Sequence, residues 1–292
     1  IAIGFLHSYA NNSHERRAAK VVQELWPEVS ITLSSEVCPE IREYERLSTA
    51  CANAYIQPLV TKYLQDLESR RHALSMTCPM LLMQSGGGLG TLDDALRFPV
   101  RLVESGPAGG ALLSAELARS LQLEKALSFD MGGTTAKLCI INGGYPRTSR
   151  EFEVGREYRF LAGSGLPLRL PVIEMVEIGA GGSSIARLDD LGRIAVGPTS
   201  AGSEPGPACY GRGGDSPTVT DADVALGRIL ADGFGKSELE FSKEAAVHAI
   251  TGAMVSAETQ DSTLAALGIV ETVDENMASA GRVHAIEQGC DI

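Results

Sequence analysis

The sequence predicts an α/β protein, and residues 1–33 already point to that class. An apolar run at 1–6 has the pattern of a buried strand, a helical stripe follows at 18–25, and residues 29–33 alternate as a second strand. Strand, helix and strand joined by short links make a βαβ unit, whose two strands pair in parallel. A strand–turn–strand pattern at 126–141 agrees with a mixed α/β architecture.

The composition is that of a globular chain with a sizeable core. The chain has 292 residues, of which 44% are hydrophobic and 21% charged, so we expect one large domain or two ordinary ones. The net charge of −12 argues against nucleic acid or an anionic membrane as the main partner, because both require a basic surface. No apolar run approaches the roughly 20 residues that a membrane-spanning helix needs.

Cysteine and histidine lack the spacing of a disulfide framework or a metal site. None of the six cysteines forms a C-x-x-C pair, which favours free thiols in a reducing cytosol and a cytoplasmic protein. The five histidines show no H-E-x-x-H or similar ligand spacing, so we interpret each as a surface or packing residue. Because Ile1 stands in place of Met and lies inside a predicted strand, we expect an internal fragment of a longer protein.

Two helices are predicted in the first quarter of the chain. Asn12 and Glu15 have the spacing of a capping box, with Asn12 capping the helix and Glu15 reaching back to it. Apolar residues then recur at helical spacing between Tyr44 and Leu67, and Pro58 is expected to kink or split this second helix.

A glycine turn between two apolar strands is the feature around which the chain is organised. At Gly132 and Gly133 the backbone can take positive φ, and no side chain separates it from a ligand. Thr134, Thr135 and the neighbouring amides can then face an anion. Asp130, at the end of the first strand, is placed to hold Mg²⁺ or to orient a water molecule. The alternative is an ordinary hairpin in which Asp130 caps the turn.

Two further glycine-rich segments adjoin predicted elements. Residues 84–88 follow the apolar strand at 79–83, which suits close approach of backbone to a ligand, and a mobile loop is the alternative. Residues 104–110 lead into a helix whose uncovered N-terminus suits a phosphate, and tight packing of the helix on a strand is the alternative.

The second half of the chain alternates short strands with glycine-rich breaks before it becomes helical. We expect residues 155–171 to be irregular and the chain after Phe241 to be mostly helical. A strand at 172–178, a glycine break at 179–184 and a hairpin over 184–188 and 194–196 are predicted between them.

The segment 197–220 is rich in glycine and proline, and it precedes two acidic residues. A disordered linker is the alternative to the ordered, functional loop that we favour, since long loops inside compact domains are usually functional. Asp221 and Asp223 open the next helix, where capping accounts for both carboxylates without a functional role.

Four glycine-rich segments at the ends of predicted elements, in this order, resemble the hydantoinase/oxoprolinase family. The resemblance is to the A-type subunit shared by N-methylhydantoinase, 5-oxoprolinase and ketone carboxylases such as acetone carboxylase. It covers nearly the whole chain, and SGPAGG with PGPACYG is a specific combination. The matching stretches are GFLHSYANNSHERRA (4–18), SSEVCPEIREYERLSTACANAYIQP (34–58), LLMQSGGG (81–88), ESGPAGG (104–110), FDMGGTTAK (129–137), IGAGGSSIARLD (178–189), VGPTSAGSEPGPACYGRGG (196–214) and PTVTDADVALGR (217–228).

The resemblance implies an actin/Hsp70/sugar-kinase-like ATPase fold, with two ribonuclease-H-like halves around ATP and Mg²⁺. Residues 1–75 then form the end of the first half with its connecting helices, and residues 76–292 form the second half with a substrate-side insertion at about 155–217. The fold is incomplete here, because the first-half D-T-G-G-T-F-T-D motif would precede Ile1 and a G-G-A-G-P motif would follow Ile292. A further departure is Lys137, where many relatives carry aspartate; a lysine there can pair with a phosphate.

The resemblance also implies the roles of individual residues. Asp130 is the expected catalytic residue and the expected ligand of Mg²⁺. Residues expected at the nucleotide are Gly86, Gly87, Gly88, Gly109, Gly110, Gly132, Gly133, Thr134, Thr135 and Lys137. Residues expected on the substrate side are Gly179, Gly181, Gly182, Ser183, Ser200, Tyr210 and Arg212, where a solvated surface charge is the alternative for Arg212.

The activity implied is ATP-dependent ring opening of a cyclic amide such as a hydantoin or 5-oxoproline, through phosphorylation of the amide oxygen. ATP-dependent carboxylation of a ketone uses the same loops and stays open, as does a nucleotide-binding scaffold without chemistry of its own. The isolated fragment is expected to be inactive. A B-type hydantoinase/oxoprolinase subunit is the expected partner, and a homo-oligomer is left open.

Overall fold

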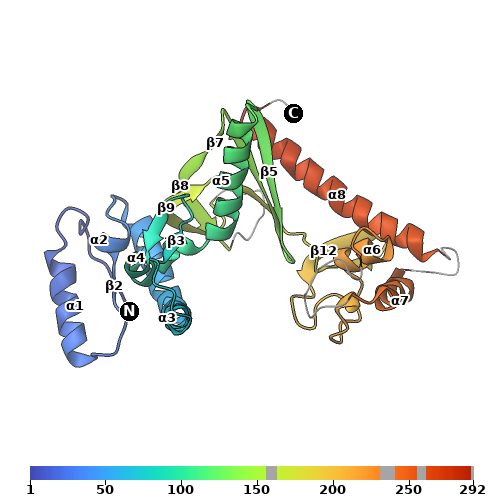
Figure 1. Ribbon diagram of the computed structural model, residues 1–292. Coiled ribbons are helices and arrows are strands. Elements are labelled where there is room, and N and C mark those ends of the chain that lie inside the picture. Colours follow the sequence, from blue (N-terminus) through green and yellow to red (C-terminus); the bar gives the residue numbers. More distant parts are fainter. Residues whose placement is uncertain (156–162, 231–240, 255–260, 291–292) are drawn as a thin grey trace. The chain divides into compact units, whose positions relative to one another are not determined.

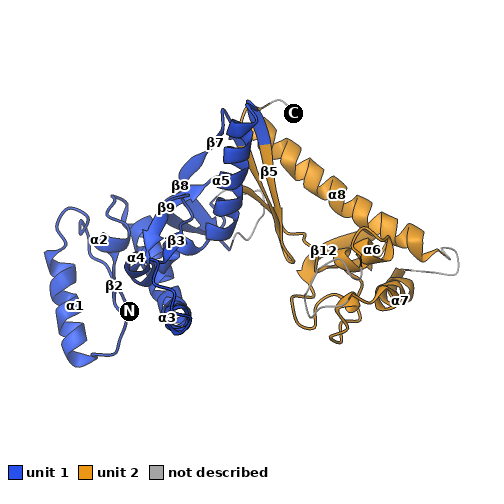
Figure 2. Ribbon diagram, in the orientation of Figure 1, with its two compact units in different colours: residues 1–126, 141–174 blue, residues 127–140, 175–292 orange. Residues whose placement is uncertain are grey.

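The computed structural model describes residues 1–155, 163–230, 241–254 and 261–290. It divides the chain into two compact units (Figure 2). Unit 1 contains residues 1–126 and 141–174, and unit 2 contains residues 127–140 and 175–292. The expected division of the chain at residues 75 and 76 stays a prediction about the two halves of the fold, since the compact units divide elsewhere.

Unit 1 begins with the predicted βαβ arrangement (Figure 1). Strands β1 (Ala2–Ile3) and β2 (Thr32–Leu33) are parallel, with Ala2 opposite Thr32 and Ile3 opposite Leu33. Helix α1 (Ser13–Leu25) connects them. Both strands are shorter than the apolar runs that predicted them, but the parallel pairing confirms the α/β class.

The predicted start of α1 was wrong in its detail. The side chain of Asn12 makes no capping hydrogen bond, and Glu15 is the single buried residue of the helix. Glu15 turns inward because five polar groups of neighbouring segments converge on its carboxylate. The apolar stripe is also largely uncovered, since Val21 and Leu25 are exposed.

Helix α3 (Glu43–Ala73) is the longest helix of unit 1 and is continuous through Pro58. Pro58 therefore does not split the helix, and the alternative expectation of a kink stays a prediction. A proline removes one backbone hydrogen bond from a helix, but packing on both sides of it can keep the turns aligned. Here α3 packs against α2 (Ser34–Val37), both strands of the βαβ unit, the short helix η1 (Pro99–Leu102) and β9 (Leu166–Ile173).

The rest of unit 1 consists of two antiparallel strand pairs and two helices. Strand β3 pairs with β4, and β8 pairs with β9. Because β9 begins at Leu166, the expected irregular segment at 155–171 was wrong from that residue onward, while residues 156–162 lie outside the described residues. The remaining elements are β3 (Leu81–Met83), β4 (Leu89–Thr91), α4 (Leu92–Arg97), α5 (Ser105–Ser120), β7 (Tyr145–Pro146) and β8 (Thr148–Val154).

The core of unit 1 lies between α3, η1 and β9. Apolar side chains from these elements and from α2 form one buried cluster, which fixes β9 against the helices. Its members are Val37, Cys38, Ala50, Val100, Leu168, Leu170 and Val172.

Unit 2 begins with most of a sheet whose strand order is β10-β6-β5. Strand β7 pairs with the last two residues of β6, Ile141 and Asn142, which belong to unit 1 as β7 does. The glycine turn joins β5 (Lys125–Met131) to β6 (Ala136–Asn142), as predicted. The predicted hairpin at 184–196 is also present, as antiparallel β11 and β12. The remaining elements are β10 (Val176–Ile178), β11 (Ser184–Leu188), β12 (Ile194–Ser200), η2 (Ala208–Tyr210), α6 (Val219–Ala225), α7 (Lys243–Met254) and α8 (Ser262–Glu287).

The core of unit 2 is built by α6, α7 and α8 against β6, β10 and β11, and it is separate from that of unit 1. Its most deeply buried members include Ala136, Ala222, Ile250, Ala266 and Ile269, each with no exposed surface. None of the helices in the described part of the chain combines the length and apolar character that crossing a membrane requires.

Candidate functional site

The turn between β5 and β6 presents its backbone to solvent. The amide of Gly132 donates to the carbonyl of Thr135 at 2.9 Å, which closes the turn. Gly132, Gly133 and Thr134 are exposed, and so is Asp130 near the end of β5. An exposed, glycine-lined backbone beside a carboxylate is the arrangement that a phosphate–metal complex needs.

The second glycine segment supports this turn from behind. The amide of Gly182 donates to the carbonyl of Gly132 at 3.0 Å, and the amide of Ser183 donates to the carbonyl of Gly133 at 2.6 Å. The hydroxyl of Ser184 accepts from the amide of Gly181 at 2.9 Å. The two glycine motifs therefore form one two-layered backbone structure, which the sequence did not predict.

The absence of a side chain at Gly181 is a requirement of this packing. A Cβ atom there would lie 2.6 Å from the carbonyl oxygen of Gly132 and 2.7 Å from the carbonyl carbon of Gly133. Both neighbours are backbone atoms and cannot rotate away. By contrast, a Cβ atom at Gly179 would meet nothing within 4 Å.

The predicted residue Ser200 and a residue that was not predicted, Thr220, reach the same region of unit 2. The hydroxyls of Thr134 and Ser200 lie 3.5 Å apart, so the end of β12 meets the turn. Thr220, in the first turn of α6, donates from its hydroxyl and from its amide to the carbonyl of Gly182, each at 2.8 Å. The helix thereby fixes the supporting layer.

A buried carboxylate organises the PGPACYG loop. Asp221 has no exposed surface and accepts from the amides of Cys209 at 2.7 Å and Ala208 at 3.2 Å. It also accepts from the amide of Thr218 at 2.9 Å and completes a capping box with that residue. The predicted capping role is confirmed for Asp221, and the loop is ordered, as favoured from the sequence. The sequence did not predict that the Asp221 carboxylate also binds the backbone amides of this loop.

The substrate-side residues in this loop have unequal environments. Burial and the nearby Asp221 carboxylate raise the pKa of the Cys209 thiol, so this cysteine is a packing residue. The ring of Tyr210 packs against Phe241 at 5.6 Å between centroids, and burial raises its pKa. Arg212 is exposed. Within the part of the chain that the structure describes, neither Tyr210 nor Arg212 makes a hydrogen bond or ion pair with the glycine turn.

Residues 84–88 of unit 1 form the turn between β3 and β4 and are ordered. The amide of Gln84 donates to the carbonyl of Gly88 at 2.8 Å, and Gly87 has a φ of +86°. Ser85 is buried and donates from its amide at 2.7 Å and its hydroxyl at 2.8 Å to the carbonyl of Arg101. A Cβ at Gly86 would lie 2.9 Å from Pro171, so packing already explains this glycine, while Gly88 faces open space.

The helix expected to begin at Gly109 and Gly110 begins earlier. Helix α5 starts at Ser105, which places both glycines in its second turn, where amides donate within the helix. The uncommitted amides of a helix belong to its first turn, and Pro107 there has no N–H group. Gly109 and Gly110 therefore lie beyond the first turn of α5, and their expected role at the nucleotide stays a prediction.

The predicted residues thus separate into two groups. The turn at 132–135, the layer at 179–183 and Ser200 come together in unit 2, whereas the turn at 84–88 and the start of α5 belong to unit 1. Within the described residues, no three His, Cys, Asp or Glu side chains gather into a metal-binding group.

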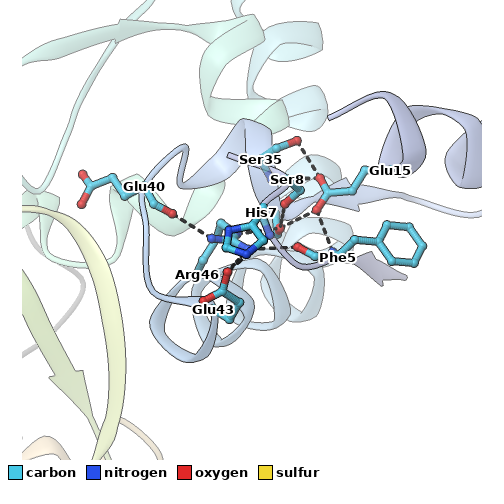
Figure 3. A network of polar contacts seen from close by, with 9 residues as sticks. Phe5, His7, Ser8, Glu15, Ser35, Glu40, Glu43 and Arg46 are labelled. Carbon is cyan, nitrogen blue, oxygen red and sulfur yellow. Dashed lines mark hydrogen bonds and ion pairs between the residues drawn. The ribbon is translucent and has the colours of Figure 1, made fainter. Parts of the chain in front are cut away.

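A polar network in unit 1 was missed by sequence reasoning (Figure 3). Glu15 and Arg46 are both completely buried. Glu15 accepts from the hydroxyls of Ser34 and Ser35, each at 2.6 Å, and Arg46 donates to Ser34 at 3.2 Å. Burial opposes the ionisation of Glu15, but these hydrogen bonds hold its pKa below the ordinary value. The signal in the sequence that could have indicated this network was a charged residue, Glu15, at a helix position that faces the core.

Arg46 extends the network to other segments. It donates to the carbonyl of Glu40 at 2.8 Å and to the carbonyl of Phe5 at 3.0 Å. The carboxylate of Glu40 in turn accepts from Arg169 of β9 at 2.7 Å. The guanidinium of Arg46 therefore joins helix α3 to the loop after β1, to α2 and to the segment that follows α2.

The chain belongs to the hydantoinase/oxoprolinase family, whose model matches residues 46–292. It is 40% identical to an uncharacterized protein of Methanocaldococcus jannaschii over 294 residues, covering 100% of this chain and 43% of that protein. It is 38% identical to caprolactamase subunit alpha of Pseudomonas jessenii, covering 100% and 40%. It is 32% identical to the acetophenone carboxylase gamma subunit of Aromatoleum aromaticum, covering 96% and 38%.

Two solved structures share the fold. The nucleotide-free structure of acetone carboxylase superposes with a TM-score of 0.84 at 24% identity, over 99% of this chain and 40% of that one. The ATP-dependent caprolactamase from Pseudomonas jessenii superposes with a TM-score of 0.65 at 35% identity, over 94% and 38%. The α/β fold class is therefore confirmed, and the chain spans about two fifths of the length of these relatives.

Proposed function

We propose that the protein uses ATP to open the ring of a cyclic amide by phosphorylating the amide oxygen. The observation that carries this proposal is the exposed glycine turn at 132–135, supported by the backbone layer at 179–183 and flanked by Asp130. Membership of the hydantoinase/oxoprolinase family and similarity to a caprolactamase subunit support the choice of a cyclic amide.

The chemistry explains why ATP is required. An unstrained amide carbonyl is a poor electrophile toward water. If its oxygen attacks the γ-phosphorus of ATP, a new P–O bond forms as the bond to ADP breaks, and the ring carbon becomes activated. Water then adds to that carbon, and the ring C–N bond breaks to leave a free amine and an acyl phosphate. A second water cleaves the acyl phosphate into the carboxylate and inorganic phosphate. Such a transfer needs mainly positioning and charge neutralisation.

The residues of the turn have distinct proposed roles. The amide of Gly133 and the hydroxyl of Thr134 donate to phosphate oxygens, while the amide of Gly132 closes the turn by donating to Thr135. The Gly181 layer keeps these amides in place. Lys137, in β6 after the turn, supplies a positive charge near the phosphates.

Asp130 fits the binding of Mg²⁺ together with a nucleotide. Mg²⁺ is usually held by one or two carboxylates together with substrate phosphates and water, so a single exposed carboxylate beside an anion-binding turn suits it. Bound there, the cation would neutralise phosphate charge. The protein's part is to hold the Asp130 carboxylate at the end of β5.

A second candidate is ATP-dependent carboxylation of a ketone. It is favoured by the 32% identity to a carboxylase gamma subunit over 96% of this chain. The relatives named as alpha and gamma subunits also support a partner subunit of the B type for the complete enzyme.

The two candidates are separated by phosphate release from the full-length protein with its partner subunit. A rate increase with hydantoin, N-methylhydantoin, 5-oxoproline or a simple lactam supports ring opening. A rate increase that requires bicarbonate together with acetone or acetophenone supports carboxylation instead. ATP binding without stimulation by any of these compounds would contradict both.

The role of Asp130 is tested by Asp130→Asn. We expect phosphate release to fall by at least about a hundredfold, because the carboxylate charge is lost while the side chain keeps its size. The control is Asp190→Asn, which changes an exposed aspartate in the turn between β11 and β12. Turnover by Asp130→Asn at the rate of this control would remove Asp130 from the mechanism.

A further inference from the structure

We propose that Thr220 is a positioning residue, which joins the expected substrate-side residue Tyr210 to the glycine turn at 132–135 and so aligns the substrate with the nucleotide. The proposal rests on the proposed function and deepens it, because it gives a residue outside the turn a part in phosphoryl transfer and not in ATP binding. The residues that carry it all belong to unit 2.

Thr220 contacts the layer behind the glycine turn with two of its groups. Its hydroxyl and its amide each donate to the carbonyl of Gly182 at 2.8 Å. The amide of Gly182 in turn donates to the carbonyl of Gly132 at 3.0 Å. A Cβ atom at Gly182 would lie 2.7 Å from the hydroxyl oxygen of Thr220, so a side chain there would compete with this contact. A single residue therefore separates Thr220 from the turn.

The side chain of Thr220 also reaches a residue expected on the substrate side. Burial raises the pKa of the Tyr210 phenol, and a hydrogen bond with the side chain of Thr220 acts in the opposite direction. The Tyr210 ring packs against Phe241 and is partly exposed, so the ring is held and remains accessible. Thr220 thus connects Tyr210 with the layer behind the turn.

The residue after Thr220 fixes the backbone that carries Tyr210. Asp221 has no exposed surface, and its carboxylate accepts from the amides of Ala208 at 3.2 Å and Cys209 at 2.7 Å. Because a buried carboxylate is costly unless it is hydrogen-bonded, these bonds hold the PGPACYG loop (205–211) firmly on the start of α6. A shift of Thr220 should therefore move Tyr210 with it.

The other end of this loop is joined to the turn by backbone alone. The amide of Gly206 donates to the carbonyl of Ala201 at 3.2 Å, and the amide of Ala201 donates to the carbonyl of Ser183 at 2.8 Å. The amide of Ser183 completes the path by donating to the carbonyl of Gly133 at 2.6 Å. The path through Thr220 is therefore the one of the two that a change of side chain can interrupt.

Such a connection acts on the transfer step more than on binding. On the proposed function the turn holds ATP and the PGPACYG loop holds the ring, so their spacing sets the distance between the amide oxygen and the γ-phosphorus. A displacement of about 1 Å between reacting groups can cost about a hundredfold in rate. Without its hydroxyl, residue 220 still donates its amide to Gly182, so the turn should still bind ATP.

The test removes the hydroxyl and keeps the shape, in Thr220→Val. Phosphate release from the full-length protein with its partner subunit is measured with ATP and a stimulating cyclic amide. We expect kcat to fall by about tenfold or more with the KM for ATP unchanged, and Thr220→Ser to restore most of kcat. The control is Thr251→Val, an exposed threonine of α7 whose hydroxyl donates to the carbonyl of Val247 at 2.7 Å. It should behave like the wild type.

A double variant tests whether Tyr210 and Thr220 act together. Tyr210→Phe removes the phenol hydroxyl and keeps the ring, and we expect it also to lower kcat. If the two side chains act through one connection, Thr220→Val with Tyr210→Phe should be no slower than Thr220→Val alone. Losses that multiply in the double variant, equal losses in Thr220→Val and Thr220→Ser, or a kcat of Thr220→Val equal to that of the control would overturn the positioning role.

A readout without substrate separates this role from the proposed function. Binding of a non-hydrolysable ATP analogue to the full-length protein should slow hydrogen exchange at 208–211 in the wild type and leave it unchanged in Thr220→Val. This pattern, found while no cyclic amide stimulates phosphate release, would contradict ring opening and support the connection. Exchange at 208–211 that does not respond to the analogue in the wild type would overturn the positioning role.

Discussion

The ionised carboxyl group of Glu15 joins three segments by hydrogen bonds: helix α1, the loop after β1 and helix α2. Burial acts against its charge, but hydrogen bonds from Ser34, Ser35 and Ser8 lower its pKa below the ordinary value of 4.5. A group whose pKa is lower in the folded state contributes stability above its unfolded pKa, and this contribution is lost as the pH falls through the folded value. The contribution of Glu15 is therefore complete at neutral pH.

We expect Glu15→Gln to destabilise unit 1 by about 2–3 kcal/mol at pH 7, because charge-assisted hydrogen bonds are lost and donors are left buried. Thermal unfolding of the full-length protein measures this. The difference in Tm between wild type and variant should narrow below about pH 4.5, where wild-type Glu15 begins to lose its contribution.

The matched control is Glu24→Gln, which changes an exposed residue of the same helix. Its effect at pH 7 should lie within about 0.5 kcal/mol. If both variants behave alike, the carboxylate of Glu15 is not the group that ties these segments together.

At the scale of elements, the glycine turn at 132–135 is held in place by a second glycine segment. The hydrogen bonds from Gly182 and Ser183 to Gly132 and Gly133 join segments separated by about fifty residues. Backbone at such close range leaves no room for side chains. The geometry of the turn therefore depends on a residue that need not touch the nucleotide.

We expect Gly181→Ala to weaken ATP binding at least about tenfold, because its Cβ would collide with the carbonyl of Gly132 at 2.6 Å and displace the turn. Gly179→Ala lies two residues away in open space and should bind ATP like the wild type. Equilibrium binding of a fluorescent ATP analogue compares them. Equal affinities of the two variants for the ATP analogue would show that the supporting layer at 179–183 does not contribute to nucleotide binding.

Elements with local signals could be predicted from the sequence. Gly132 and Gly133 between apolar runs predicted the hairpin of β5 and β6, and the turn after Leu188 predicted that of β11 and β12. The contact of Gly181 with Gly132 and the network of Glu15 with Arg46 were missed, because their partners are distant in sequence. Helical periodicity identified the apolar stripe of α1 but carries no information about what covers it.

At the scale of the whole molecule, each unit has its own core. The buried cluster around Val100 and Leu168 lies entirely in unit 1, and that around Ile250 and Ile269 lies entirely in unit 2. Regions with separate cores open as separate cooperative units. A mutation that removes packing from one core should therefore lower the stability of the unit that contains this core.

We expect Ile269→Ala to destabilise unit 2 by about 2–5 kcal/mol, because it leaves a cavity at a completely buried position. Hydrogen exchange of the full-length protein should speed up in α6 and α8 and stay unchanged in α3. Leu264→Ala, at a position of α8 that is 62% exposed, is the control. Faster exchange in α3 would show that the two cores unfold as one.

The order of the units along the chain has a consequence for how the protein is made. Unit 1 ends at residue 174, after residues 127–140 of unit 2 have already been synthesised. The nascent turn at 132–135 therefore leaves the ribosome before either its supporting layer at 179–183 or the helix α8, which shares a core with β6. Because unit 1 consists of two separate stretches of the chain, no single cut divides the protein into its two units.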